Sequence, residues 1–147
     1  MQDRDRVWAI GVDLGGQSVK LALVDETGRI GPRRQAPLDA GQAVEHITAL
    51  IVQEINTLSE DARRAGLEPV GVGMVMPGYM DAARSKLVFA ANLPTLNGTD
   101  FLGVIRRSLD LPVVFDADSN AAAYGEYRFG AGQDVDRLIV VAIGTGI

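Results

Sequence analysis

Residues 7–24, VWAIGVDLGGQSVKLALV, decide the fold of this chain. Two apolar runs, 7–13 and 19–24, flank Gly15 and Gly16. Short apolar runs separated by a glycine turn predict two β-strands joined by a tight hairpin. Residues 29–37 extend the pattern as a third strand, placed at the sheet edge because Pro32 cannot donate a ladder hydrogen bond.

A helix follows this three-stranded unit. Apolar residues recur at spacings of three and four from Val44 to Ala62, and Gly66 marks the end of the helix. Asp39 with Gln42 three residues later predicts a capping box at its start.

The second half of the chain alternates strands and helices. The expected elements are a strand over 70–76, a helix from Thr99 or Asp100 to about Leu109, a strand over 112–115, a helix over 120–127 and a strand over 138–143. The order β-β-β-α-β-α-β-α-β predicts an α/β fold with a mixed sheet.

Composition excludes several kinds of chemistry. The 147 residues suit one domain, and the net charge of −5 argues against nucleic acid as a partner. The absence of cysteine excludes thiolate nucleophiles and disulfides, and His46 is the single histidine, expected on the solvated side of the helix. No stretch has the length of a membrane span or the pattern of a leader, so no membrane partner and a cytoplasmic location are expected.

Asp13, Gly15 and Gly16 suggest an anion site at the end of the first strand. Glycines let backbone N–H groups approach an anion without a Cβ, and a carboxylate beside them suits a metal-bound polyphosphate. The segment Gly144-Thr145-Gly146 is a second turn of the same kind. The alternative is that both segments are merely tight turns.

Asp118 follows the strand over 112–115 and precedes a helix, where ligands of α/β sheets usually bind. One carboxylate there could accept a proton from an attacking hydroxyl. Alternatively Asp116, Asp118 or Ser119 caps the helix. The loops at Pro77-Gly78 and Asn92-Leu93-Pro94 could contact a polyol or could be only turns.

Five segments in this order resemble the N-terminal half of the ROK family (repressors, open reading frames and sugar kinases). They are IGVDLGGQSVKLALVDETGRI, VGVGMVMPGYMD, AANLP, DADSNAAAYGEYRFGAG and VVAIGTGI. The family belongs to the actin-like, hexokinase-like ATPases. The resemblance implies an actin-like (ribonuclease H-like) lobe over 1–117 and the beginning of a second lobe over 118–147.

The resemblance also implies a glucokinase-like enzyme that transfers a phosphoryl group from ATP to a hydroxyl of a hexose or amino sugar. It makes Asp118 the general base, and it places Gly78, Asn92 and Asp118 against the sugar. Asp13 would face Mg²⁺ and the nucleotide. The phosphates would be bordered by Gly15, Gly16, Gln17, Gly144, Thr145 and Gly146.

Two residues depart from the family pattern. Gln17 stands where the family usually has Thr, and Ala117 stands where an Asn usually bonds the sugar. Ala117 therefore puts the usual glucose contacts in doubt. The family's remaining sugar ligands, its adenosine-binding segment and its cysteine-rich zinc motif would follow Ile147. The chain is accordingly expected to be a fragment that is inactive alone, and the full-length protein is expected to be a homodimer or homotetramer.

Two non-enzymatic functions remain as alternatives. A sugar-sensing ROK transcriptional regulator would carry a helix-turn-helix ahead of the first strand, and a strand starting by about Val7 leaves no room for one. A non-catalytic sugar-binding protein would agree with Ala117. Asp118 and the glycine turns favour the kinase, because a pure binder needs no phosphate-binding turns.

Overall fold

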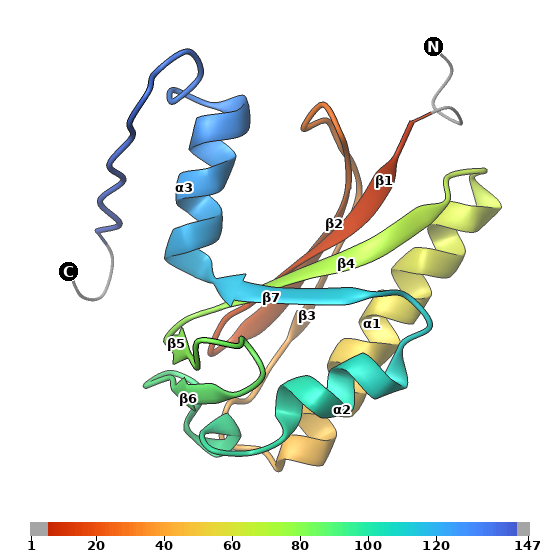
Figure 1. The fold of residues 1–147 in the computed structure, drawn as a ribbon. Coiled ribbons are helices and arrows are strands. Elements are labelled where there is room, and N and C mark those ends of the chain that lie inside the picture. Colours follow the sequence, from red (N-terminus) through yellow and green to blue (C-terminus); the bar gives the residue numbers. More distant parts are fainter. Residues whose placement is uncertain (1–5, 144–147) are drawn as a thin grey trace.

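The computed structural model of this chain describes residues 6–143 (Figure 1). A five-stranded sheet with the order β3-β2-β1-β4-β7 forms its centre. The elements in chain order are β1 (Trp8–Leu14), β2 (Ser18–Asp25), β3 (Ile30–Pro37), α1 (Val44–Arg64), β4 (Pro69–Met76), β5 (Tyr79–Met80), β6 (Leu87–Phe89), the 3₁₀ helix η2 (Pro94–Leu96), α2 (Phe101–Ser108), β7 (Val113–Ala117) and α3 (Asp118–Phe129).

The sheet is mixed, as the sequence predicts. β1 runs antiparallel to β2, and β2 runs antiparallel to β3. β1 is parallel to β4, and β4 is parallel to β7. The three parallel strands therefore point their carboxyl ends toward one edge, where ligands of open α/β sheets bind.

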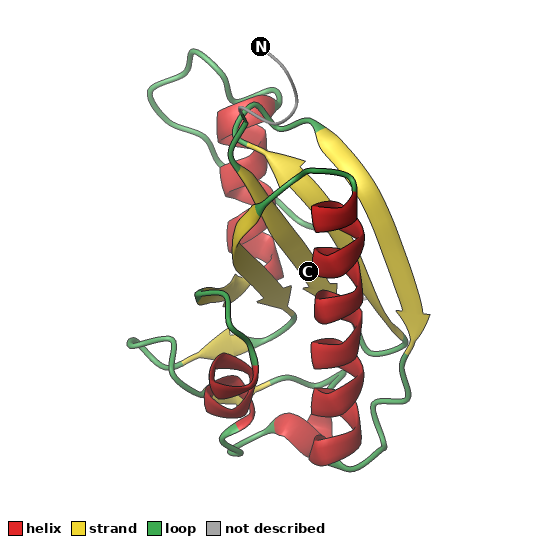
Figure 2. Cartoon of the chain, turned by 90° about the vertical axis from the view of Figure 1, so that its right-hand side faces the viewer, coloured by secondary structure: helices red, strands yellow, loops and turns green. Residues whose placement is uncertain are grey.

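One face of the sheet carries the hydrophobic core. Trp8, Ile10, Val12 and Leu14 alternate along β1 and are buried, because every second side chain of a strand points to the same face. Helix α1 packs on this face and against α2 (Figures 1 and 2). The apolar seam of α1 is buried in this core: Ile47, Ile51, Ile55, Leu58 and Ala62.

The structure corrects three details at helix starts. The capping box is wrong: α1 begins at Val44 without a side-chain cap, and Asp39 instead accepts a hydrogen bond from the Gly41 amide at 2.9 Å. The carboxylate is thus satisfied in a turn before the helix. Asp100 is at the N-cap of α2, but its side chain accepts no capping hydrogen bond; one carboxylate oxygen pairs with Arg107 instead. Helix α3 starts at Asp118, two residues before the predicted start.

The strand predicted over 138–143 is wrong. These residues form no strand, and Ile139, Val141 and Ile143 are exposed. The small β5–β6 hairpin was not predicted. His46 is exposed on α1, as expected. Among the described residues, no helix is both long enough and apolar enough to cross a membrane.

Candidate phosphoryl-transfer site at the sheet edge

The predicted carboxylates lie at one edge of the sheet. Asp13 of β1 is in register with Val75 of β4, and Val75 is in register with Asp116 of β7. Because neighbouring strands are about 4.8 Å apart, the Cα atoms of Asp13 and Asp116 are about 10 Å apart. Asp118 follows two residues later, so the predicted nucleotide side and the predicted base share this edge.

The β1–β2 turn leaves two backbone amides available to an anion. The Gly15 amide donates to the Ser18 carbonyl at 2.9 Å and thereby closes the hairpin. Within residues 6–143, the amides of Gly16 and Gln17 donate no hydrogen bond. These two N–H groups are therefore the ones that a phosphate could accept from, whereas Gly15 contributes the tight turn itself.

Gly16 brings the turn against the loop that carries Asn92. A Cβ on Gly16 would lie 2.8 Å from the Asn92 carbonyl oxygen and 3.2 Å from the Asn92 Cβ. Only glycine fits at this distance. Two residues that the resemblance assigns to different ligands, the phosphates and the sugar, are thus in contact, and both remain accessible to solvent.

Gly78 has a structural reason to be glycine. Its φ is +98°, and a Cβ there would lie 2.1 Å from the Phe89 carbonyl oxygen. The chain can therefore turn from β4 into the β5–β6 hairpin only without a side chain. The next loop is held by Asn97, whose Oδ1 accepts the Ala90 amide at 2.8 Å.

Asp118 is the first residue of α3 and is exposed. Its Oδ1 accepts the Ser119 amide at 2.7 Å, and no other group in the described part of the chain hydrogen-bonds to this carboxylate. No side chain caps α3, so the capping alternative for Asp116, Asp118 and Ser119 is wrong. The Asp118 carboxylate retains acceptor capacity toward solvent.

A polar network that the sequence reasoning missed lies beside Asp118. Asp116 Oδ1 accepts hydrogen bonds from the Ala117 amide and from Asn120 Nδ2, both at 2.8 Å. Asp116 Oδ2 lies 3.1 Å from a guanidinium nitrogen of Arg84. The spacing of four between Asp116 and Asn120 is a sequence signal for such a contact, but nothing in the sequence points to Arg84.

The Arg84 loop is itself held by hydrogen bonds. Asp81 accepts the amides of Ser85 and Lys86 at 2.6 and 2.9 Å and the Ser85 hydroxyl at 2.7 Å. The hydrogen bond from the Ser85 hydroxyl is the largest of the effects that lower the pKa of Asp81. The loop between β5 and β6 is therefore closed around a charged carboxylate.

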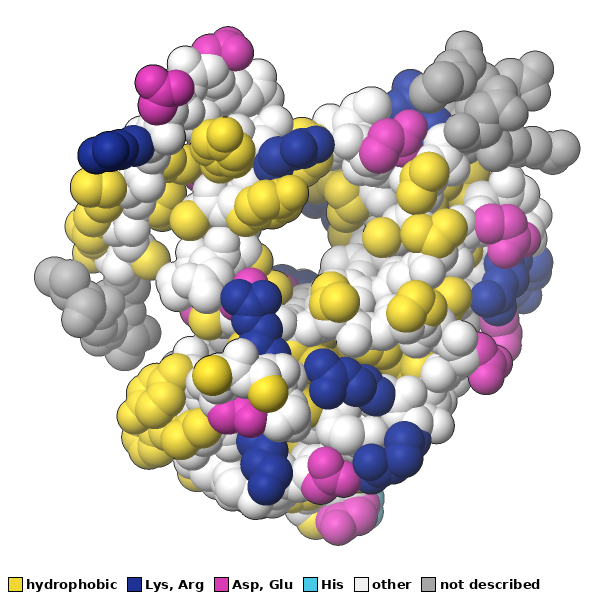
Figure 3. All heavy atoms as spheres, viewed as in Figure 1, with side chains coloured by type: hydrophobic (Ala, Val, Ile, Leu, Met, Phe, Trp, Pro, Cys, Tyr) yellow, Lys and Arg dark blue, Asp and Glu magenta, His cyan; other side chains and the backbone are white. Residues whose placement is uncertain are grey.

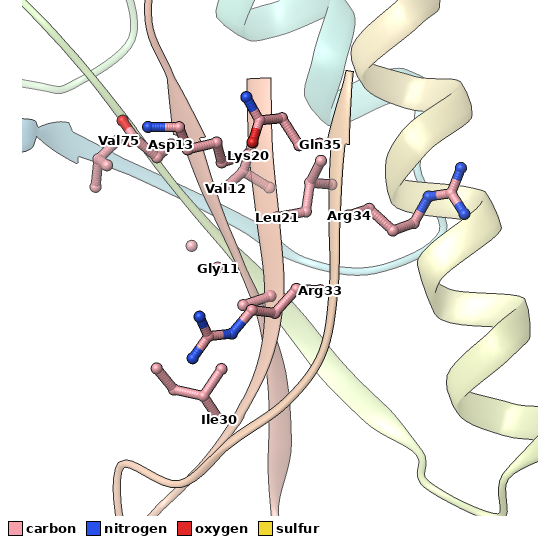
Figure 4. Close-up of a pocket in the computed structure, with 12 residues that line it drawn as sticks. Gly11, Val12, Asp13, Lys20, Leu21, Ile30, Arg33, Arg34, Gln35 and Val75 are labelled. Atoms are coloured by element: carbon pink, nitrogen blue, oxygen red, sulfur yellow. The ribbon is translucent and has the colours of Figure 1, made fainter. Parts of the chain in front are cut away.

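A groove of about 600 Å³ runs along the open face of the sheet (Figure 4). Its floor is made of small residues, including Gly11, Ala22 and Gly73. Asp13 and Lys20 lie at one end of the groove on paired positions of β1 and β2. In Figure 3, a deep opening separates α3 from the sheet, and basic and acidic side chains are interspersed over the face in view.

Metal binding would depend on Asp13 together with a ligand. Residues 6–143 contain no group of three or more His, Asp or Glu that could hold a metal by themselves. Mg²⁺ is commonly bound by one or two carboxylates plus substrate phosphates, so an exposed Asp13 beside two free amides fits a magnesium-nucleotide. The second predicted turn, residues 144–146, lies outside the described residues.

Comparison with known proteins identifies the family. Residues 9–147 match the sequence pattern of the ROK family. The chain belongs to the ROK family. Its mixed α/β sheet matches ROK glucokinases of the actin-like ATPase fold, with a TM-score of 0.75 to the Streptomyces griseus ROK glucokinase in complex with glucose and AMPPNP. That structure is 36% identical, and the match covers 88% of this chain and 39% of that one.

Similar sequences include both kinases and repressors. The glucokinase of Streptomyces coelicolor is 36% identical over 138 residues, which are 94% of this chain and 41% of the relative. The xylose repressor of Bacillus subtilis is 28% identical over 140 residues, 95% of this chain and 36% of the relative. The chain thus spans less than half the length of these relatives.

Proposed function

We propose that the protein is an ATP-dependent sugar kinase that phosphorylates a hydroxyl of a hexose or amino sugar. The observation that carries this proposal is the contact of Gly16 with Asn92. It lies at the edge of the sheet where β7 ends and Asp118 begins α3. This contact brings a phosphate-binding turn beside a polyol-binding loop, which is what direct transfer between two bound ligands requires.

Asp118 acts as the general base. The sugar hydroxyl oxygen bonds to the γ-phosphorus while the bond from that phosphorus to the β,γ-bridging oxygen breaks, and the hydroxyl proton passes to the Asp118 carboxylate. Its exposed position and its single hydrogen bond to the Ser119 amide leave an oxygen available for that proton.

The β1–β2 turn holds the phosphates. The amides of Gly16 and Gln17, which donate to no acceptor in residues 6–143, would donate to the phosphates, and Gly15 closes the turn. Asp13 would hold Mg²⁺. Bound Mg²⁺ neutralises charge that develops on the transferred group. We further propose, from the resemblance to the ROK family, that Gly144, Thr145 and Gly146 border the phosphates and that a second lobe begins at residue 118.

The sugar lies against Gly78, Asn92 and Asp118. Ala117 supplies no side-chain hydrogen bond at its position, so the preferred sugar differs from glucose or is held by other contacts. The glucokinases among the relatives support the kinase class. As parts of the same proposal, the full-length protein is cytoplasmic and a homodimer or homotetramer, and any structural Zn²⁺ is bound by residues after Ile147.

A sugar-responsive regulator is the second candidate, favoured by similarity to xylose repressors. A regulator needs sugar binding but no proton transfer. The two functions therefore predict different results when the Asp118 carboxylate is removed.

The test compares Asp118→Asn with the wild type in the full-length gene product. General-base removal should lower kcat for sugar phosphorylation by about 10²- to 10⁴-fold. The matched control is Asp110→Asn, an exposed carboxylate before β7 that should leave kcat unchanged. A sugar-binding protein without ADP formation in either form would contradict the kinase and support the regulator.

A further inference from the structure

We propose that Asp116 is a positioning residue that sets the place of Asp118 through a three-membered bridge with Arg84 and Asn120. This inference rests on the proposed kinase function and identifies the residues that position its general base. The bridge joins three elements: the β5–β6 loop, the end of β7 and the first turn of α3.

Few interactions of the Asp118 side chain itself fix its position. Its carboxylate contacts only the neighbouring Ser119 amide within residues 6–143. Helix α3 has no side-chain cap, and none of its described residues is buried. The position of Asp118 therefore follows from how the first turn of α3 is attached to β7.

Asp116 provides that attachment with both carboxylate oxygens. Oδ1 accepts the Ala117 amide on one side of Asp118 and Asn120 Nδ2 on the other, each at 2.8 Å. A bond on either side of one residue fixes the backbone between them. The direction in which Asp118 leaves the strand is thereby set by Asp116.

Arg84 anchors the other oxygen. Its guanidinium lies 3.1 Å from Asp116 Oδ2, and its carbonyl accepts a hydrogen bond from Arg106 of α2 at 3.2 Å. Arg84 adopts a left-handed φ of 51°, which a non-glycine residue adopts only where its surroundings impose it. The bridge therefore transmits the placement of α2 and the β5–β6 loop to the base.

The exposure of the Arg84 and Asp116 side chains indicates that the bridge positions Asp118 more than it stabilises the fold. The side chains of Arg84 and Asp116 are 54% and 30% exposed. Exposed ion pairs contribute little to the free energy of unfolding. A small displacement of a reacting group, in contrast, has a large effect on the rate.

The experiment measures kcat, the KM values for sugar and ATP, and Tm in the full-length gene product. Asp116→Ala should lower kcat about 100-fold, and Arg84→Gly and Asn120→Ala about 10-fold each, with KM for ATP unchanged. Arg84→Gly suits the left-handed backbone, so it removes the guanidinium without straining the loop. Asp116→Asn keeps an acceptor for Ala117 and Asn120 and should recover most of the activity lost in Asp116→Ala.

The matched control is Asp100→Asn, another exposed carboxylate paired with an arginine, which should leave kcat unchanged. A merely structural role would lower Tm without this split between kcat and KM and without rescue by Asn. Activity of Asp116→Ala within twofold of an active wild type overturns the inference alone. If Asp116→Ala does not fold, a wild-type kcat in both Arg84→Gly and Asn120→Ala likewise overturns the inference alone. An inactive wild type overturns the kinase proposal together with this inference.

Discussion

At the scale of single residues, the proposed function gives Ala117 and Asp118 different roles: Ala117 bears on which sugar is preferred, and Asp118 on proton transfer. Ala117 is the N-cap of α3, with extended backbone angles that an asparagine also adopts. Asp118 begins the helix and keeps its carboxylate exposed. Under the proposed function, residue 117 therefore bears on which sugar hydroxyls are held, and Asp118 on whether the proton is removed.

Ala117→Asn should raise kcat/KM for glucose about 5-fold, because one added hydrogen bond contributes about 1 kcal/mol. Steady-state kinetics with glucose and with the preferred sugar check this, and Ala122→Asn on exposed α3 serves as the control. If the ratio of kcat/KM for glucose to kcat/KM for the preferred sugar is the same in Ala117→Asn as in the wild type, residue 117 does not contact the sugar.

Asp25 gives a prediction about pH. Its burial raises the pKa, but hydrogen bonds from Thr27, the Arg29 amide and Arg6 outweigh this and lower the pKa from 3.8 to about 2. Because the folded pKa lies below the unfolded one, the stabilisation is present above about pH 4 and is lost as pH falls toward 2.

The Tm of the wild type should therefore exceed that of Asp25→Asn near neutral pH, and the gap should shrink as pH falls from about 4 to 2. Thermal unfolding monitored by circular dichroism measures the gap, with Asp39→Asn as the control for an exposed carboxylate. A constant gap across this range would contradict the assignment.

At the scale of elements, the accuracy of the sequence predictions depends on whether an element is specified locally. The apolar runs of β1, β2 and β4 and the seam of α1 were predictable because their burial follows a short period. The run over 138–143 has the same composition, but no described strand pairs with it. A strand needs a partner for its backbone groups, and a local pattern does not supply one.

The candidate site also divides into features that the local sequence specifies and contacts between distant segments that it does not. The glycine turn and Asp118 were predictable from their positions after apolar runs. The contact of Gly16 with Asn92 and that of Arg84 with Asp116 join distant segments, so only the folded chain brings them together.

Gly16→Ala tests the close approach of the β1–β2 turn to the loop that carries Asn92. The added Cβ would lie 2.8 Å from the Asn92 carbonyl, so the turn and the loop must separate. We expect a stability loss of about 1–3 kcal/mol and higher KM values for both substrates. Gly11→Ala in β1 is the control, because its Cβ would have an ordinary contact of 3.8 Å. Equal kinetics in the two variants would contradict the close approach.

At the scale of the whole molecule, the proposed function gives this chain one side of a site that lies between two lobes. It spans 41% of the Streptomyces coelicolor glucokinase that it resembles. Phosphoryl transfer needs the ligands to be enclosed so that water does not compete with the sugar hydroxyl. Under the proposed function, residues 1–147 supply Asp118 as the base and the β1–β2 turn for the phosphates, and further ligand contacts belong to the part of the relative that this chain does not cover.

A polypeptide of residues 1–147 should therefore fail to release ADP in response to any sugar, whereas the full-length gene product should do so. A coupled assay of both proteins at equal concentration measures this difference. Sugar-dependent turnover by the short polypeptide above a no-sugar blank would show that this half contains a complete site.

The central claim is tested most directly by ADP release from the full-length gene product with magnesium-ATP and a panel of hexoses and amino sugars. The account predicts a rate well above the no-sugar blank for at least one sugar, and loss of that rate in Asp118→Asn. A folded protein that binds a sugar from the panel without ADP release, or an Asp118→Asn variant as active as the wild type, would contradict it.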